Sequence, residues 1–273
     1  AYRLASWRTA FDEINYRRFF DVNDLAGLRM EDPEVFQATH ALILRLIGQG
    51  RITGLRIDHP DGLFDPARYF RELQSASHAA LAAAGRQGRA LFVVAEKVCS
   101  AGERLPEDWA VHGTTGYGFL NDLNGLFVDS AKVARLGRVF SRVSGRPASP
   151  AEVVYTSKRV IMLTSMASEL NVLAHALNRL SERDRRSRDF TLNSLRRALI
   201  EVVACFPIYR TYVASDGPSD ADLAAIDTAI AGARRQSAVV SPSILDFIRR
   251  MLSASGPDEA GPDAGVSRAD RLA

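Results

Sequence analysis

Helical and apolar segments alternate between residues 31 and 97, and this order constrains the fold most. Residues 31–50 carry apolar side chains at helical spacing, residues 65–85 repeat their layout, and both segments end in glycine. Each is followed by a short apolar stretch, 51–58 and 90–97, of the length of a buried strand. A strand, a crossover helix and a second strand make parallel neighbours. The sequence therefore predicts an α/β fold with a parallel sheet or barrel.

Both helical segments begin in the same way. Asp32 precedes Pro33, and Asp65 precedes Pro66. An aspartate side chain accepts hydrogen bonds from the free N–H groups at a helix start, and proline fits the first helical position. We therefore interpret Asp32 and Asp65 as helix caps and not as site residues.

The second half of the chain has a helical pattern. Residues 116–130 are expected to hold one more strand or an irregular turn. Amphipathic spacing predicts helices over four later segments: 163–180, 190–206, 221–235 and 243–253. Of these, 190–206 is expected to be capped by Asp189 and ended by Pro207. The final stretch, 254–273, has almost no bulky apolar residues and is expected to be disordered.

Composition argues against several classes of protein. The formal charge is +3, from 35 basic and 32 acidic residues, and no basic stripe carries interleaved aromatics, so nucleic acid is not an expected partner. No apolar run approaches the roughly 20 residues of a membrane span, so no membrane partner is expected either. The two cysteines form no C-x-x-C motif, which fits a reduced, cytoplasmic protein without disulfides.

The stretch "GLRIDHPDGL" at 54–63 ends an apolar run in ionisable groups. Side chains alternate along a strand, so Leu55 and Ile57 face one way while Arg56 and Asp58 face the other. A charge leaves water at a cost of several kcal/mol unless it is paired, and Arg56 can supply the partner of Asp58. The arginine should also keep Asp58 ionised, as a carboxylate nucleophile requires.

A second acidic residue, Glu96, ends the next apolar stretch. Asp58 and Glu96 would therefore close neighbouring strands, which lie about 4.8 Å apart in a sheet. Two carboxyl groups in that position can approach the roughly 5–5.5 Å of a retaining glycosidase pair. In that chemistry one carboxylate attacks the sugar and the other donates and later removes a proton.

Each of these residues also has an ordinary structural interpretation. An R-x-D sequence is often a structural ion pair, and a glutamate at a strand end often has no special role. Asp61 is expected to shape the turn before a glycine, and His59 either contacts substrate or stabilises the turn. His40 and His175 lie within predicted helices and are interpreted as structural. No pair of histidines has metal-ligand spacing, so neither a metal nor another cofactor is expected.

The strand-end motifs resemble those of the α-amylase superfamily, which carries its nucleophile in G-[FL]-R-x-D and its acid/base glutamate at the end of the next strand. Longer blocks resemble the maltooligosyl trehalose synthase family within it, and these lie at 15–36, 105–129, 168–182 and 188–213. The resemblance extends from about residue 2 to about residue 250.

This resemblance implies a reaction and a set of roles. The family converts the α-1,4 bond at the reducing end of a maltooligosaccharide to α-1,1 by intramolecular transglycosylation. Carried over by position, Asp58 would be the nucleophile and Glu96 the general acid/base. Arg56 would orient Asp58, and His59 and Lys97 would line the sugar site.

The chain departs from the family in two motifs. The third carboxylate of the superfamily, expected in a segment like G-x-E-D-T-A-F-Y, has no counterpart, and the early D-x-V-x-N-H motif is missing. We therefore expect an internal piece of a longer enzyme. Residues 1–130 would form part of a (β/α)8 TIM-type barrel, 131–253 a helical insertion and 254–273 a disordered tail.

Three other functions stay open. The chain could be an α-1,4-glucan hydrolase, an inactive carbohydrate-binding or structural fragment, or a helical interaction module built from 131–253.

Overall fold

The computed structural model describes residues 4–253, except 87, 89, 101, 147–148 and 215–216. The predicted disorder of 254–273 lies outside the described residues. Two compact units are present: Gly27–Leu136 form one, and the described residues of Ala1–Ala26 and Gly137–Ala273 form the other. The predicted division at residue 130 lies near the observed one at 136. The first 26 residues, however, group with the helical unit and not with the sheet.

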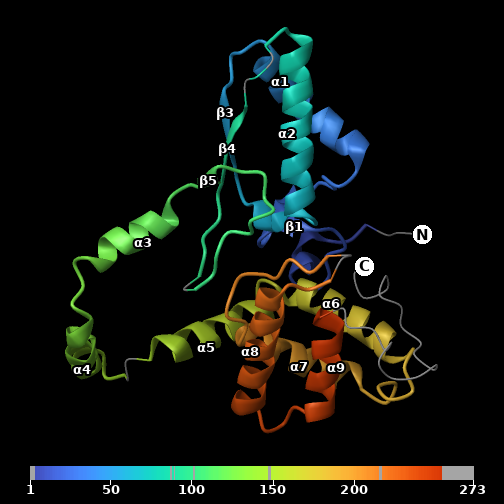
Figure 1. Ribbon diagram of the computed structural model, residues 1–273. Helices are drawn as coiled ribbons and strands as arrows, with labels where there is room; N and C mark the ends of the chain where they lie inside the picture. The colour runs from blue at the N-terminus through green and yellow to red at the C-terminus, as the bar shows by residue number, and fades with distance from the viewer. Residues whose placement is uncertain are drawn as a thin grey trace. The chain divides into compact units, whose positions relative to one another are not determined.

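A three-stranded parallel sheet organises the unit 27–136 (Figure 1). Its strands are β3 (Gly54–Ile57), β4 (Phe92–Ala95) and β5 (Gly113–Thr114), in that spatial order. Helix α1 (Pro33–Gly48) precedes β3, and α2 (Pro66–Ala83) connects β3 to β4. The predicted order of helix, strand, helix and strand is confirmed, although the strands are shorter than the apolar stretches. The fold class is mixed α/β with mostly helical content.

Both predicted caps are present. The Asp32 side chain accepts a hydrogen bond from the Glu34 N–H, and the Asp65 side chain accepts one from the Arg68 N–H. Each helix therefore begins where the Asp-Pro sequence indicates. The sequence signal for a helix start was strong because it depends on neighbouring residues alone.

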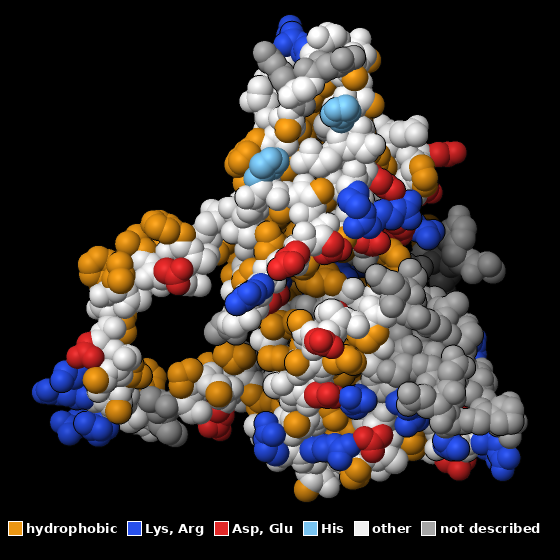
Figure 2. All heavy atoms as spheres, in the orientation of Figure 1, with side chains coloured by type: hydrophobic (Ala, Val, Ile, Leu, Met, Phe, Trp, Pro, Cys, Tyr) orange, Lys and Arg blue, Asp and Glu red, His pale blue; other side chains and the backbone are white. Residues whose placement is uncertain are grey.

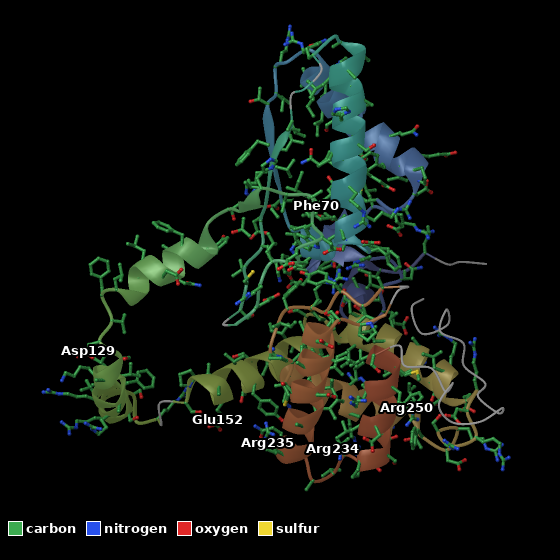
Figure 3. The ribbon with its side chains drawn as sticks, in the orientation of Figure 1. Phe70, Asp129, Glu152, Arg234, Arg235 and Arg250 are labelled. Carbon is green, nitrogen blue, oxygen red and sulfur yellow. The ribbon has the colours of Figure 1, made fainter. Side chains whose placement is uncertain are left out.

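One face of the sheet is buried and the other is open. Val93 and Ala95 on β4 are fully buried, whereas Phe92, which alternates with them, is 54% exposed. The helices supply fully buried side chains to this core, among them Phe70 and Leu73 of α2 (Phe70 is labelled in Figure 3). The helices therefore cover one face of the sheet, and the polar residues of β3 lie on the open face.

Residues 117–136 differ from the prediction. Tyr117–Gly125 form helix α3, where a strand or irregular turn was expected, and the turn Ser130–Lys132 leads into α4 (Val133–Ser144). Neither α3 nor α4 has a buried residue. The prediction was wrong because the α3 segment contains two glycines, two asparagines and an aspartate, which are residue types typical of turns.

Helices pack around α7 in the second unit. It contains α5 (Pro150–Leu163), α6 (Ala167–Ser181), α7 (Leu192–Ala204), α8 (Asp220–Gln236) and α9 (Pro242–Leu252). Helix α7 contacts α5, α6, α8 and α9. Its Leu195, Ala198 and Val202 form a core with buried residues of α8 and α9. The predicted helices at 221–235 and 243–253 are confirmed.

Two boundaries in this unit differ from the prediction. The predicted helix at 163–180 is present as α6 but begins four residues later, because the chain bends by 84° between α5 and α6. Helix α7 is capped by Thr191, whose side chain accepts a hydrogen bond from the Ser194 N–H, and not by Asp189. Asp189 lies two residues too early to reach the free N–H groups of the first turn.

The N-terminal residues form a small hairpin in the same unit. After a 3-10 turn (Trp7–Phe11), β1 (Arg18–Phe19) pairs antiparallel with β2 (Val22–Ala26). The buried Arg18 side chain bonds Glu169 of α6 with 2.7 Å between Nε and Oε1. It also donates to the Ser165 carbonyl oxygen at 2.8 Å. This contact attaches the hairpin to the helical core.

Within the described part of the chain, no single helix is long and apolar enough to cross a membrane. The bent pair α5 and α6 meets the length and composition requirement only when both are counted together.

Candidate functional site

The sheet brings Asp58 and Glu96 to neighbouring strand ends. Ile57 lies opposite Ala95 in the parallel register of β3 and β4. The ladder continues one step further, because the Glu96 N–H donates to the Ile57 carbonyl oxygen at 2.8 Å. Asp58 and Glu96 therefore follow at the same level at the C-terminal edge of the sheet. They alternate with the buried residues, so they belong to the open face.

The predicted ion pair of Arg56 and Asp58 is present. Arg56 Nη2 lies 2.7 Å from Asp58 Oδ1, and the two side chains are 54% and 62% exposed. An exposed pair contributes about 0–1 kcal/mol to stability. Its main consequence is therefore orientation: the guanidinium group holds one Asp58 oxygen, and the other stays available on the open face.

His59, which directly follows Asp58, adopts a rare backbone conformation. It is left-handed, with φ 45° and ψ 53°. In this conformation its N–H donates to Glu96 Oε2 at 3.2 Å. Non-glycine residues in this region carry strain and concentrate at functional sites. The loop after β3 thus holds the carboxylate at the end of β4.

Gly62 makes room for the His59 ring. A Cβ atom at residue 62 would lie 2.7 Å from His59 Cδ2, closer than real contacts allow. The ring therefore packs directly over the glycine backbone. The glycine of "HPDG" is required for this approach, a role that sequence reasoning did not assign.

Lys97 is placed differently from the other predicted sugar-site residues. Its side chain has no exposed surface, and Nζ lies 3.0 Å from Asp61 Oδ2 and 2.6 Å from Glu103 Oε1. Burial acts to lower the pKa of Lys97, but the hydrogen bonds that its ammonium group donates to Glu103 and Asp61 outweigh it and raise that pKa. The ammonium group is thus held charged in a cluster of buried carboxylates, apart from the exposed Arg56–Asp58 pair.

The cluster joins two loops. Asp61 lies in the turn Pro60–Gly62 after β3, while Lys97 and Glu103 lie in the segment after β4. Glu103 also accepts a hydrogen bond from the Ser100 N–H at 2.8 Å. Asp61 was expected only to shape its turn, and Glu103 was not singled out. A lysine directly after a buried strand was the available signal, because a buried lysine requires carboxylate partners.

The two histidines that were interpreted as structural lie on helices and not in the loops after β3 and β4. His40 is buried on α1, where Nε2 lies 2.9 Å from the Tyr69 hydroxyl, and burial raises the pKa of Tyr69 to about 12. His175 lies exposed on α6, in the other unit. Among the residues that the structure describes, no group of three or more His, Cys, Asp or Glu side chains could hold a metal ion.

Comparison with known proteins gives a consistent result. No protein-family model matches the chain. Two Mycobacterium tuberculosis proteins (strains CDC 1551 / Oshkosh and H37Rv), each described as "Putative maltooligosyl trehalose synthase", are 39% identical over 128 residues, which is 47% of this chain. The chain spans 15% of the length of these relatives.

Solved structures match over a longer range. The maltooligosyltrehalose synthase of Arthrobacter ramosus is similar over 99% of this chain, with a TM-score of 0.76 and 33% identity. This chain covers 31% of that protein. A Sulfolobus tokodaii structure described as a hypothetical maltooligosyl trehalose synthase matches 87% of this chain and 27% of its own length, with a TM-score of 0.61 and 26% identity. By sequence and by fold, the chain is therefore similar to a part, about a third or less, of maltooligosyl trehalose synthases.

Proposed function

We propose that this chain carries the nucleophile and the general acid/base of an intramolecular transglycosylase that acts on maltooligosaccharides. Asp58 is the nucleophile and Glu96 the acid/base, and the sheet is part of a (β/α)8 barrel whose interior is the open face. The observation that carries the proposal is the register of β3 and β4, because it puts both carboxylates at one level of one sheet edge. The active edge of parallel barrels is this C-terminal one.

The reaction has two steps. Glu96 donates a proton to the oxygen of the reducing-end α-1,4 bond while Asp58 attacks the sugar C1, which releases glucose and forms a glycosyl-enzyme ester. The released glucose stays bound and turns. Its C1 hydroxyl then attacks the ester, Glu96 removes the proton, and Asp58 leaves as a carboxylate. Two displacements at the same carbon retain its configuration, and the product bond is α-1,1.

The loop contacts support these roles. Arg56 holds one oxygen of Asp58, and the His59 N–H holds one oxygen of Glu96. Catalysis depends on orientation of this kind before substrate arrives. Arg56 is proposed to orient the nucleophile, His59 to contact the sugar, and Lys97 to hold the loops that line the site. No cofactor is required by this chemistry, and the substrate class fits a cytoplasmic location.

Hydrolysis is the second candidate, and one observation favours it. The Asp58 side chain is 62% exposed, so water could reach a glycosyl-enzyme ester formed there. Isomerisation exceeds hydrolysis only where water is excluded and glucose is retained. The sequence segment expected for a third carboxylate is also missing, which favours an inactive fragment over either reaction. Turnover by this chain is therefore what the assay must establish.

One assay separates the candidates. The chain is incubated with maltopentaose, and reducing ends and short sugars are both measured. Isomerisation removes reducing ends without releasing short sugars, whereas hydrolysis increases reducing ends. Unchanged reducing power together with calorimetric binding of maltopentaose would indicate an inactive carbohydrate-binding fragment instead.

The Asp58→Asn variant tests the nucleophile. It should lose any turnover and keep the fold, because the amide has nearly the same shape but cannot form the ester. Asp108→Asn is the matched control, since Asp108 is an equally exposed aspartate that lies 3.8 Å from an arginine, Arg71. Activity that persists in Asp58→Asn would remove Asp58 from the proposed role.

A further inference from the structure

The unit 27–136 carries an arginine-lined hollow at the edge of the sheet opposite Asp58 and Glu96. The hollow has a volume of about 470 Å³ and is lined by Arg45, Gly48, Gln49, Arg51, Ala84 and Arg86. It lies where α1 and α2 end and before β3 begins, which is the N-terminal edge of the sheet. Figure 2 shows basic side chains at the end of this unit where α2 ends. No residue of the proposed sugar site lines the hollow.

Two of the arginines occupy the same position in two matching helix ends. Gly50 follows α1 with φ 72°, and Gly85 follows α2 with φ 68°. The next N–H in each case donates back five residues: Arg51 to the Leu46 carbonyl oxygen at 3.0 Å, and Arg86 to that of Leu81 at 2.9 Å. This is the Schellman ending of a helix. The repeated glycine-arginine sequence thus fixes the backbone of both arginines.

Close packing brings the two helix ends together. A Cβ atom at Gly48 would lie 3.1 Å from the Ala80 carbonyl oxygen of α2. A Cβ atom at Gly50 would lie 2.3 Å from Arg86 Nη1, so the Arg86 guanidinium group lies directly over this glycine. The side chain from one helix end is therefore held against the backbone of the other.

The charge of the hollow is unbalanced. Four other arginines of this unit lie within ion-pair distance of a carboxylate: Arg29 with Glu31, Arg56 with Asp58, Arg68 with Glu72, and Arg71 with Asp108. In the described part of the chain, no carboxylate lies within 4.0 Å of the guanidinium groups of Arg45, Arg51 or Arg86. Three like charges that converge without a counter-ion repel one another, and a bound anion would relieve this repulsion.

Helix ends alone do not explain the arrangement. A basic side chain near the C-terminus of a helix is stabilised by the helix dipole and can bond the last carbonyl oxygens. Among the described residues, however, the guanidinium groups of Arg45, Arg51 and Arg86 make no hydrogen bond to a carbonyl oxygen. Their N–H donors are therefore available to a ligand in the hollow.

We propose that this hollow binds the phosphate group of a small phosphorylated metabolite. Guanidinium groups bind phosphate through paired N–H donors, and three of them together match a doubly charged oxyanion. The Gln49 side chain can add an amide donor. The site is independent of the proposed sugar chemistry, because it lies at the other edge of the sheet and shares no residue with it.

Calorimetric titration of the full chain with inorganic pyrophosphate and with inorganic phosphate tests the proposal, with maltopentaose as the uncharged comparison. Saturable binding of pyrophosphate that weakens with added salt is expected. The double variant Arg51→Gln/Arg86→Gln should bind about a hundredfold more weakly, since each charged hydrogen-bonding partner contributes about tenfold. The control Arg71→Gln, an arginine of α2 outside the hollow, should bind like the wild type.

Emission of the buried Trp109, measured in a Trp7→Phe background, shows whether each variant keeps its fold. Should the glutamine variants unfold, Arg51→Lys/Arg86→Lys keeps both charges and should still weaken binding, because lysine lacks the paired donors. Three results would each overturn the proposal: no binding by the wild type at millimolar pyrophosphate, equal binding by folded double variants, or an equal loss in Arg71→Gln.

Discussion

A lysine ammonium group without exposed surface stabilises a fold only if carboxylates surround it. Lys97 meets this condition, because the side chains of its partners Asp61 and Glu103 are 9% and 7% exposed. The three residues connect the turn after β3 with the segment after β4. The same two segments carry Asp58 and Glu96, so the buried cluster holds the geometry of the exposed site.

Replacing Lys97 by methionine should therefore destabilise the unit 27–136 by about 3–5 kcal/mol, because two buried carboxylates lose their partner. Urea unfolding followed through Trp109 measures this loss, in a Trp7→Phe background that removes the other, exposed tryptophan. The triple variant with Asp61→Asn and Glu103→Gln is the control and should recover part of the stability. A folded Lys97→Met variant of unchanged stability would contradict the assigned role.

The stability difference between the wild type and Lys97→Met should also depend on pH in the alkaline range. The folded pKa of Lys97 is raised above its unfolded value, with burial acting against the two carboxylates that raise it. The stability from its charge is then complete below the unfolded lysine pKa, about 10.4, and is lost as pH rises through the folded pKa. The difference in unfolding free energy between wild type and Lys97→Met should thus stay constant near neutral pH and shrink above about pH 10.4.

At the scale of single helices, the start of α7 distinguishes two candidate N-cap residues, Thr191 and Asp189. Thr191 accepts a hydrogen bond from the Ser194 N–H, whereas the exposed Asp189 lies before the cap. Thr191→Ala should therefore lower the stability of the helical unit by about 1 kcal/mol. Asp189→Ala is the matched control and should change it by less than about 0.5 kcal/mol. Thermal unfolding followed by circular dichroism compares them, and the opposite order would restore Asp189 as the cap.

The elements that sequence reasoning predicted share a local cause. Helices α1 and α2 begin at Asp-Pro, and β3 and β4 are short apolar runs between them, so neighbouring residues alone determine these elements. Helix α3 was missed because its sequence, YGFLNDLNG, is rich in glycine, asparagine and aspartate, which favour turns. The start of α6 was placed at residue 163 instead of 167, because Leu163 and Met166 continue its apolar spacing.

The candidate site divides in the same way. Alternation along a strand was enough to put Arg56 and Asp58 on one face and to pair Asp58 with Glu96 on the next strand. The environment of Lys97 could not be predicted, because its partners come from two separate loops that meet only in the folded chain. The left-handed backbone of His59 was equally hidden, since L-residues other than glycine rarely adopt it and histidine does not mark it in a sequence.

At the scale of the whole chain, residues 1–26 belong to the helical unit although 110 residues of the sheet unit, 27–136, follow them in sequence. The connection centres on Arg18, whose side chain is 1% exposed and which donates to both oxygens of Glu169. It also donates to the Ser165 carbonyl oxygen. The N-terminal hairpin and the helices of 137–253 are therefore joined through Arg18, and we expect the helices to be less stable without this contact.

Arg18→Met should lower the stability of the helical unit by about 2–3 kcal/mol, since the hydrogen bonds that it removes are made by a charged group. Arg17→Met is the matched control: Arg17 is the adjacent, exposed arginine, and its loss should have little effect. Urea unfolding followed by far-ultraviolet circular dichroism measures both variants. Equal stability of Arg18→Met and Arg17→Met would show that the hairpin is not needed by the helices.

The stability from the Arg18–Glu169 ion pair should depend on pH with the opposite sign to that from Lys97. Burial acts to raise the pKa of Glu169, but the hydrogen bond from Arg18 and those from its own N–H and Ser168 outweigh it and lower that pKa. The stability from a lowered carboxyl pKa is present above the unfolded value, about 4.3, and is lost as pH falls through the folded value. Acid should therefore destabilise the wild type more steeply than Arg18→Met below about pH 4.3, so that their unfolding curves converge. Parallel curves down to the acid limit would mean that Arg18 contributes through packing and not through its charge.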